Sequence, residues 1–122
     1  MDLDQFKRTY FQECTELLSD AEFHLMALEN GGGDADTMNA VFRAVHSIKG
    51  GAGAFGFTRL VGFAHIFETA LDSLRNGNVP ASRETIELML RSRDLVADLV
   101  AAAQQDVDAT PGMEDEAKAA LG

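Results

Sequence analysis

The chain has 122 residues, the length of one compact domain with a single hydrophobic core. Its composition, 46% hydrophobic and 25% charged, is typical of a globular protein and excludes a disordered chain. Twenty acidic and ten basic side chains give a formal net charge of -10, which disfavours binding to nucleic acid and to anionic lipid headgroups. No apolar run approaches the ~18 residues of a membrane-spanning helix, so we predict no membrane insertion.

The cysteine content and the start of the chain bear on the cellular compartment. Cys14 is the only cysteine, so no internal disulfide forms, and nothing favours an oxidising compartment. Residues 1–4 read Met-Asp-Leu-Asp and lack the apolar stretch of a secretory signal. We therefore expect a cytoplasmic domain.

Apolar residues recur every three to four positions, which predicts helices in the first half of the chain. The first helix is predicted over residues 3–28, with Asp2 as its N-cap and a turn where three glycines follow Asn30. A second apolar stripe begins after a cap at Asp34 or Asp36 and closes near residues 55–57.

Three more helices are predicted in the second half. Thr58 is the expected N-cap of the third helix, which stops at Asn76 and Gly77. Ser82 caps the fourth, whose broad apolar side continues to about residue 105. A short fifth helix is predicted to begin with Pro111 at its first helical position and to end near residue 121.

Four long amphipathic helices with short connections predict an all-α fold, an antiparallel four-helix bundle with an additional short C-terminal helix. Each apolar stripe leaves water only by packing against the others. We expect a single domain over residues 1–122, with the bundle over about 2–105 and the fifth helix over about 111–121. The domain itself is expected to be monomeric.

His46 stands apart from the buried side of the second helix. Val41, Val45 and Ile48 mark that side, and a rotation of 100° per residue places His46 about 120 to 140° away from it. The imidazole of His46 is therefore predicted to face solvent.

Glycines surround this histidine on the helix surface. Gly50 and Gly53 are predicted on the same exposed side as His46, with Gly51 next to them. Each glycine inside a helix costs about 1 kcal/mol relative to alanine, so this run needs a compensating gain. One gain is close approach of another protein to the helix at His46. The alternative is that the glycines allow tight packing against a neighbouring helix or end the second helix early.

Charged and polar partners for His46 are available on two helices. Lys49 follows His46 by three residues, and His65 and Glu68 share one side of the third helix. If the two helices are antiparallel neighbours, Glu68 or His65 comes beside His46. A carboxylate bound to Nδ1–H would fix the tautomer and leave Nε2 as a nucleophile.

Two other classes of function remain open from the residues alone. A metal-binding bundle could use His46, His65 and Glu68, although a di-iron bundle needs a second Glu-x-x-His unit and further inward glutamates. A helical scaffold or dimerisation module would need none of the histidines. Cys14 and His24 have no assigned chemistry: Cys14 lies on a buried stripe, and His24 on the polar flank of the first helix.

Residues 42–57 read Phe-Arg-Ala-Val-His-Ser-Ile-Lys-Gly-Gly-Ala-Gly-Ala-Phe-Gly-Phe. This stretch closely resembles the phosphorylated helix of histidine-containing phosphotransfer (HPt) domains, above all the N-terminal domains of chemotaxis histidine kinases. The resemblance implies a bundle in which His46 accepts a phosphoryl group from an ATP-bound kinase catalytic domain. It further implies transfer to an aspartate of a response-regulator receiver domain, CheY-like or CheB-like.

The resemblance also implies roles for the neighbouring residues. Lys49 matches the lysine beside the phosphate, Glu68 the Nδ1 partner of the histidine, and His65 a supporting residue. No cofactor or metal is expected in this domain, because partners would bring ATP and Mg²⁺, and the chain is expected to be a fragment of such a kinase. Contacts with the partners are expected at these residues around the glycines: Arg43, Ser47, Gly50 and Gly53.

Overall fold

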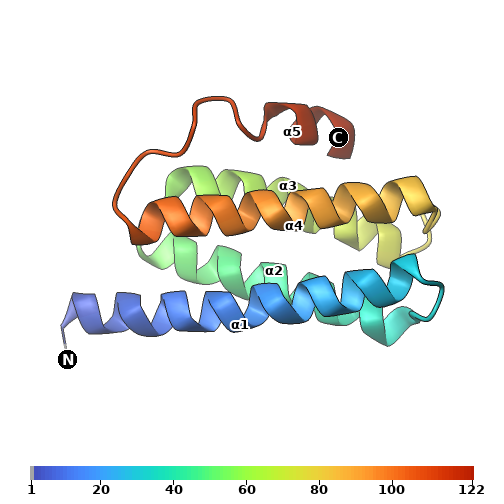
Figure 1. Cartoon of the computed structure of the whole chain (residues 1–122), viewed down its shortest axis with the longest axis horizontal. Helices are drawn as coiled ribbons and strands as arrows, with labels where there is room; N and C mark the ends of the chain where they lie inside the picture. Colours follow the sequence, from blue (N-terminus) through green and yellow to red (C-terminus); the bar gives the residue numbers. More distant parts are fainter. Residues whose placement is uncertain (1) are drawn as a thin grey trace.

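The structure is a computed structural model that describes residues 2–122, so Met1, the first residue of the predicted domain 1–122, lies outside it. Within these residues the chain forms five α-helices and no strand (Figure 1). The helices are α1 (Leu3–Glu29), α2 (Ala35–Ala54), α3 (Thr58–Arg75), α4 (Arg83–Gln104) and α5 (Asp115–Leu121).

The four long helices run alternately up and down, and each packs against two others (Figure 1). α1 lies between α2 and α4, and α3 completes the square by contacting the same two helices. The short α5 lies against α3 and α4. This arrangement confirms the predicted all-α bundle with an additional C-terminal helix.

Side-chain caps define where three of the helices begin. Asp2 accepts a hydrogen bond from the Gln5 amide at 2.8 Å, and Ser82 caps α4 in the same way. Asp34, rather than Asp36, caps α2 and forms a reciprocal pair with Thr37. Since each such cap contributes typically ~1 kcal/mol, these short polar residues locate the helix starts.

The predicted cap of α3 is wrong. Thr58 is the first helical residue, and Phe57 occupies the N-cap position without a side-chain hydrogen bond. The Thr58 hydroxyl instead donates to the Gly56 carbonyl at 3.3 Å, so it bonds backward to the turn and not to the helix amides.

The fifth helix begins at Asp115 and not near residue 111, which also corrects the prediction for Pro111. Residues 111–114 form turns, with Gly112 at φ +73°. The Arg59 side chain holds the carbonyls of residues 109 and 110 and the Glu114 carboxylate. These bonds from α3 hold the segment before Asp115 against the bundle in a non-helical conformation.

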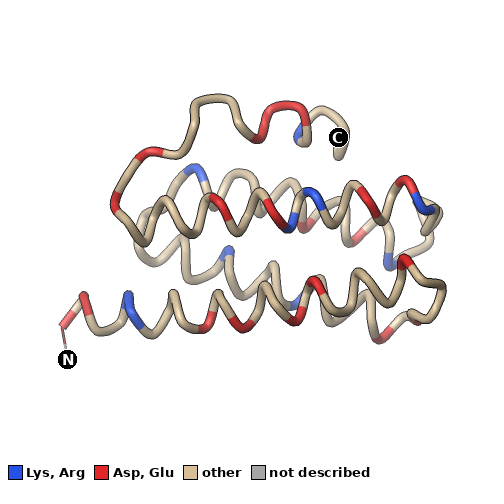
Figure 2. Tube along the Cα trace, viewed as in Figure 1, with Lys and Arg blue, Asp and Glu red and all other residues tan. Residues whose placement is uncertain are grey.

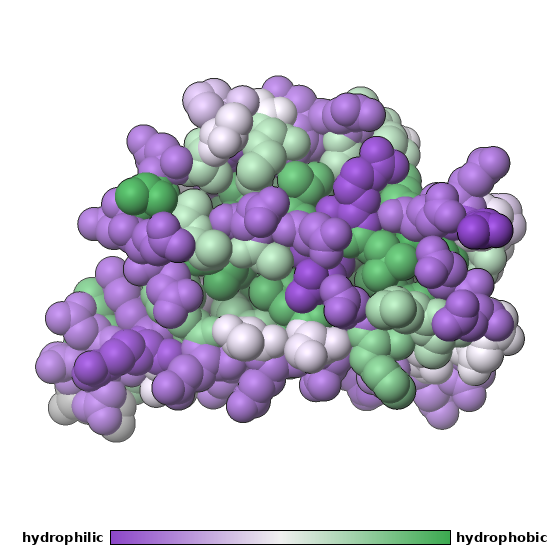
Figure 3. All heavy atoms as spheres, in the orientation of Figure 1, coloured by the Kyte–Doolittle hydropathy of each residue, from purple (hydrophilic) through white to green (hydrophobic). Residues whose placement is uncertain are grey.

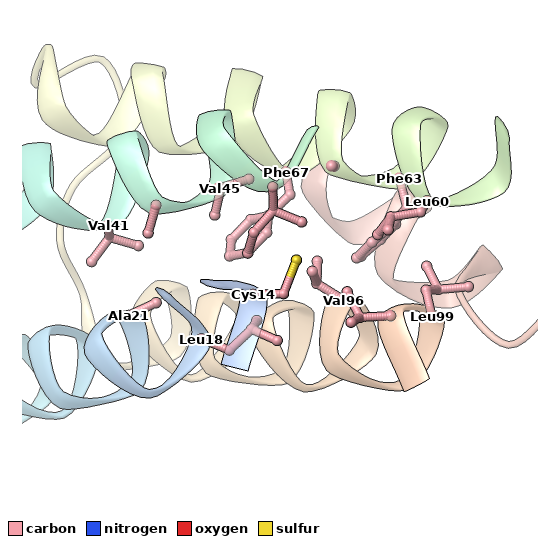
Figure 4. Close-up of a cluster of buried hydrophobic side chains, with 14 of the residues drawn as sticks. Cys14, Leu18, Ala21, Val41, Val45, Leu60, Phe63, Phe67, Val96 and Leu99 are labelled. Carbon is pink, nitrogen blue, oxygen red and sulfur yellow. The ribbon is translucent and has the colours of Figure 1, made fainter. Parts of the chain in front are cut away.

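The core is built from side chains of all four long helices (Figure 4). Phe63 and Phe67 of α3 lie at its centre with no exposed surface, and the side chain of Cys14 points among them from α1. Burying an aliphatic or aromatic side chain of this size contributes roughly 1.5–3 kcal/mol, so this shared core orients α2 and α3 for the site.

Charge and apolar surface are unevenly distributed on the outside. Acidic residues recur along α1 and in the C-terminal segment (Figure 2). In the view of Figure 3, hydrophobic residues show between α1 and α4 and again between α4 and the C-terminal segment. Among residues 2–122, no helix combines the length and apolar character needed to cross a bilayer.

Candidate functional site

The hairpin of α2 and α3 brings three of the predicted site residues into direct contact. Nδ1 of His46 lies 2.7 Å from Oε2 of Glu68, and Nζ of Lys49 donates to the other oxygen, Oε1, at 2.8 Å. His46 and Lys49 are one turn apart on α2, so both reach the same carboxylate on α3. Of the two candidates left open by the residues alone, Glu68 rather than His65 therefore lies beside His46.

Exposure differs sharply within this cluster. The His46 side chain is 62% exposed, whereas Lys49 and Glu68 are 22% and 13% exposed. With Nδ1 on Glu68, the other ring nitrogen, Nε2, has no hydrogen-bond partner among residues 2–122. The arrangement presents one nitrogen to solvent and holds the other on a largely buried carboxylate.

The Glu68 carboxylate stays ionised despite its burial. Partial burial acts to raise its pKa, but the hydrogen bonds from Lys49 and His46 and the nearby positive charge outweigh this effect. The pKa of Glu68 therefore lies below its usual range. An ionised carboxylate accepts a hydrogen bond from Nδ1–H and so favours the tautomer with the lone pair on Nε2.

The glycines next to His46 fall into two kinds. An added Cβ at Gly50 or Gly53 would meet nothing within 4 Å, so the helix surface beside His46 is bare. At Gly51 the same atom would lie 2.2 Å from Cε1 of Tyr10, so Gly51 permits close packing of α1 on α2. The alternative of tight packing is thus correct for Gly51, and the early helix end is wrong because α2 continues to Ala54.

The remaining predicted site residues form no hydrogen bond with the cluster in the described part of the chain. Arg43 and Ser47 are exposed and line a shallow groove of about 190 Å³ between α1 and α2. His24 is half-buried in the same groove. His65 is exposed one turn before Glu68, and within the described part of the chain its side chain forms no hydrogen bond.

Comparison with known proteins decides the family. The sequence pattern of the Hpt domain matches residues 5–109, which is most of the chain. The chain belongs to the Hpt domain family. This Hpt domain is 52% identical over 104 residues to chemotaxis protein CheA of Rhizobium meliloti and 42% identical over 115 residues to that of Salmonella typhimurium. These alignments cover 85% and 94% of the chain but only 14% and 16% of the two relatives.

A solved structure shares the fold of this Hpt domain. The phosphorylated P1 domain of CheA3 from R. sphaeroides, in complex with CheY6, matches with a TM-score of 0.82 and 28% identity. The match covers 98% of this chain and 93% of that domain. The bundle with its short fifth helix is therefore the fold of a CheA P1 domain.

The metal-binding alternative depends on His46, His65 and Glu68 coming together. Across residues 2–122, no group of three or more histidine, cysteine, aspartate or glutamate side chains is placed to hold a metal ion. His46 and Glu68 are in contact, and Lys49 binds the second carboxylate oxygen, but these residues and His65 are not among any group of described residues placed to hold a metal ion.

Sequence reasoning missed two features of the Hpt domain. The ring of Phe42 lies parallel to the His46 ring, and the Arg75 guanidinium lies over the Phe42 ring. The four-residue spacing of Phe42 and His46 was a usable signal. Arg59 binds Glu114 through two nitrogens, at 2.7 and 2.6 Å, across 55 positions of sequence, which no local pattern reveals.

Proposed function

We propose that this Hpt domain is a phosphoryl carrier: Nε2 of His46 accepts a phosphoryl group from an ATP-bound kinase domain and donates it to a receiver-domain aspartate. The proposal depends on the contrast between the two ring nitrogens of His46, one bound to a carboxylate and the other without a partner in the described structure. Nδ1 of His46 is 2.7 Å from the Glu68 carboxylate, while the side chain is 62% exposed. A nucleophile with an orienting group is what transfer between two visiting proteins requires.

The chemistry follows from that geometry. The Nε2 lone pair attacks the γ-phosphorus of ATP, an N–P bond forms, and the bond to the β,γ-bridging oxygen breaks with its electron pair leaving on ADP. The imidazole becomes a cation, which the ionised Glu68 stabilises through the proton on Nδ1. In the second step an aspartate oxygen of the receiver attacks phosphorus, and the N–P electron pair returns to Nε2.

Neighbouring side chains supply charge and access. Lys49 lies next to the reacting ring and would balance part of the ~-1.5 to -2 charge expected on the phosphoryl group by analogy with phosphoserine. Bare helix at Gly50 and Gly53 would let a partner approach in line, and we keep Arg43 and Ser47 as partner contacts beside it. His65, one turn from Glu68, remains a supporting residue in this proposal.

The partners are inferred from the family. The structural neighbour was solved with the response regulator CheY6, which supports a CheY-like receiver as acceptor, with a CheB-like receiver as a further candidate. The CheA relatives, which are much longer than this chain, support a kinase domain as the donor, with ATP and Mg²⁺ brought by the partners. Since ATP is the phosphoryl source, we also propose a cytoplasmic location.

Labelling with radioactive ATP tests the proposal directly. The domain is incubated with Mg²⁺, ATP and the kinase domain of a CheA relative, and His46→Gln is compared with wild type. His24→Gln is the matched control, because His24 is a half-buried histidine away from Glu68. We expect label in wild type and His24→Gln only, and equal label in His46→Gln would reject the proposal.

A further inference from the structure

An aromatic ring restrains the same histidine from a second direction. Phe42 precedes His46 by one turn of α2, its ring centroid lies 6.1 Å from that of His46, and the two planes differ by 8°. Phe42 is half-buried and packs against the core, so its ring has less freedom than that of the exposed His46. Parallel, offset aromatic pairs at this separation attract each other.

The Phe42 ring is itself held by α3. The Cζ atom of Arg75, the last residue of α3, lies 3.8 Å from the ring centroid. The guanidinium is fixed by donating to Oδ1 of Asp72 at 2.8 Å and to Oδ1 of Asn39 at 3.4 Å. Arg75 follows Glu68 by seven residues, or two turns, so α3 supports both the Nδ1 side of His46 and its aromatic neighbour.

A hydrogen bond alone does not determine where Nε2 points. With only the bond from Nδ1 to Glu68, the imidazole can still swing through coupled changes of its two side-chain torsions while Nδ1 stays near the carboxylate. A ring held parallel to the imidazole opposes that rotation, because the swing would break the aromatic contact. The hydrogen bond and the parallel ring together define the direction of the Nε2 lone pair.

We propose that Phe42, held by Arg75, is a positioning residue that aims Nε2 of His46 for in-line phosphoryl transfer. This inference rests on the phosphotransfer function proposed above. Transfer between two docked proteins has a fixed geometry, and small errors in the position of the nucleophile are costly there. A small phosphodonor that approaches freely does not depend on a preset direction.

Substitutions at position 42 test the proposal by separating kcat from KM. In Phe42→Leu, which keeps an apolar side chain but removes the planar ring, we expect kcat for labelling by the kinase domain to fall about tenfold. KM should stay within about twofold, because Phe42 is half-buried and the exposed side chains around His46 are unchanged. Phe42→Tyr keeps the ring and should retain the wild-type kcat. Phe55→Leu is the matched control, since Phe55 is a half-buried aromatic residue that packs on Tyr10.

Phosphoramidate is a small phosphodonor that needs no kinase. It distinguishes an effect on the direction of the Nε2 lone pair from an effect on the reactivity of His46. Phe42→Leu should react with it within about twofold of the wild-type rate. A loss of rate with both donors would overturn the positioning role, because the ring would then govern reactivity or folding. An unchanged kcat with the kinase domain in Phe42→Leu would overturn this inference alone. Equal kinase labelling of wild type and His46→Gln would overturn the proposed function and this inference with it.

A second variant keeps the test decisive if Phe42→Leu fails to fold. Arg75→Gln removes the guanidinium from the ring at a residue whose side chain is 31% exposed, so the fold should persist. We expect its kcat to fall in the same direction by a smaller factor, again with KM and the phosphoramidate rate retained. A wild-type kcat in a folded Arg75→Gln would show that Arg75 does not hold the ring in position.

Discussion

Alanine substitutions at Gly50, Gly51 and Gly53 should distinguish glycines that leave room for a partner protein from the glycine that allows α1 to pack on α2. All three glycines lie in α2, and none has a positive φ, so each replacement raises helix propensity, by about 1 kcal/mol in the helix interior. At Gly50 and Gly53 the new methyl group meets nothing within 4 Å, so no clash opposes that gain. Gly50→Ala should therefore be more stable than wild type by about 1 kcal/mol, and Gly53→Ala by less, because Gly53 is the second-last residue of α2.

Gly51→Ala should change stability in the opposite direction. Its Cβ would lie 2.2 Å from Cε1 and 2.4 Å from Cδ1 of Tyr10. Tyr10 has little room to retreat, because its hydroxyl donates to the Ile48 carbonyl at 2.7 Å and its ring packs on that of Phe55. Overpacking of this kind costs typically 1–3 kcal/mol and outweighs the propensity gain. We expect a net loss of about 1 kcal/mol.

Thermal unfolding followed by circular dichroism measures these differences. One kcal/mol corresponds to a shift in Tm of about 4 °C for a domain of this size, so the Gly50→Ala and Gly51→Ala variants should differ by roughly 8 °C. A stabilised Gly51→Ala would refute the argument that Tyr10 requires a glycine there.

The same variants test why the bare surface exists. If Gly50 and Gly53 serve partner access, their alanine variants should transfer phosphate to the receiver more slowly although they are more stable. Labelling by phosphoramidate should be unaffected, because a small donor does not need the clearance. Transfer to the receiver at the wild-type rate in both variants would contradict an access role for these glycines.

Two further predictions concern the carboxylates that bridge helices. Glu68→Gln should lower the rate of labelling by the kinase domain about tenfold while the circular dichroism spectrum stays that of wild type, and unchanged rates would remove Glu68 from the mechanism. Glu114→Gln should lower Tm at pH 7. The hydrogen bonds from Arg59 hold the pKa of Glu114 below its usual range, so its contribution is present above the ordinary carboxyl pKa of about 4.3 and is lost as the pH falls through the lowered value. The difference in Tm between wild type and Glu114→Gln should therefore close in acid, and a constant gap down to about pH 2 would contradict the ion pair.

Local patterns predicted the helices and the exposure of His46 well, because both depend on residues within one or two turns. The apolar stripe of α2 faces the core along its length, so the direction of His46 follows from counting residues. The prediction of Thr58 as the N-cap of α3 failed because a threonine hydroxyl can bond to the preceding turn as well as to the helix amides. The sequence does not distinguish these two possibilities. The predicted start of α5 was wrong, and no local pattern indicates that Arg59, 50 positions away, binds the segment before this helix.

The parts of the site that the sequence did not predict depend on contacts between helices. His65 and Glu68 lie on one side of α3, one turn apart, and only the register of α3 on α2 selects Glu68 as the neighbour of His46. The same register decides that Tyr10 reaches Gly51 and not the adjacent Gly50. Such choices depend on packing across the hairpin and the α1 interface, which the spacing of residues within one helix does not encode.

Lys49 gives the proposed cycle its charge balance. Before phosphorylation its ammonium is bound to Glu68 at 2.8 Å, so the carboxylate beside the imidazole already has a counterion. Phosphorylation adds a dianionic group and turns the imidazole into a cation, which now needs the same Glu68 as its counterion. Lys49 can then turn toward the phosphoryl oxygens without leaving Glu68 unpaired. With the phosphoryl dianion, the imidazolium, the Glu68 carboxylate and the Lys49 ammonium counted together, the phosphorylated cluster carries a net charge of about -1.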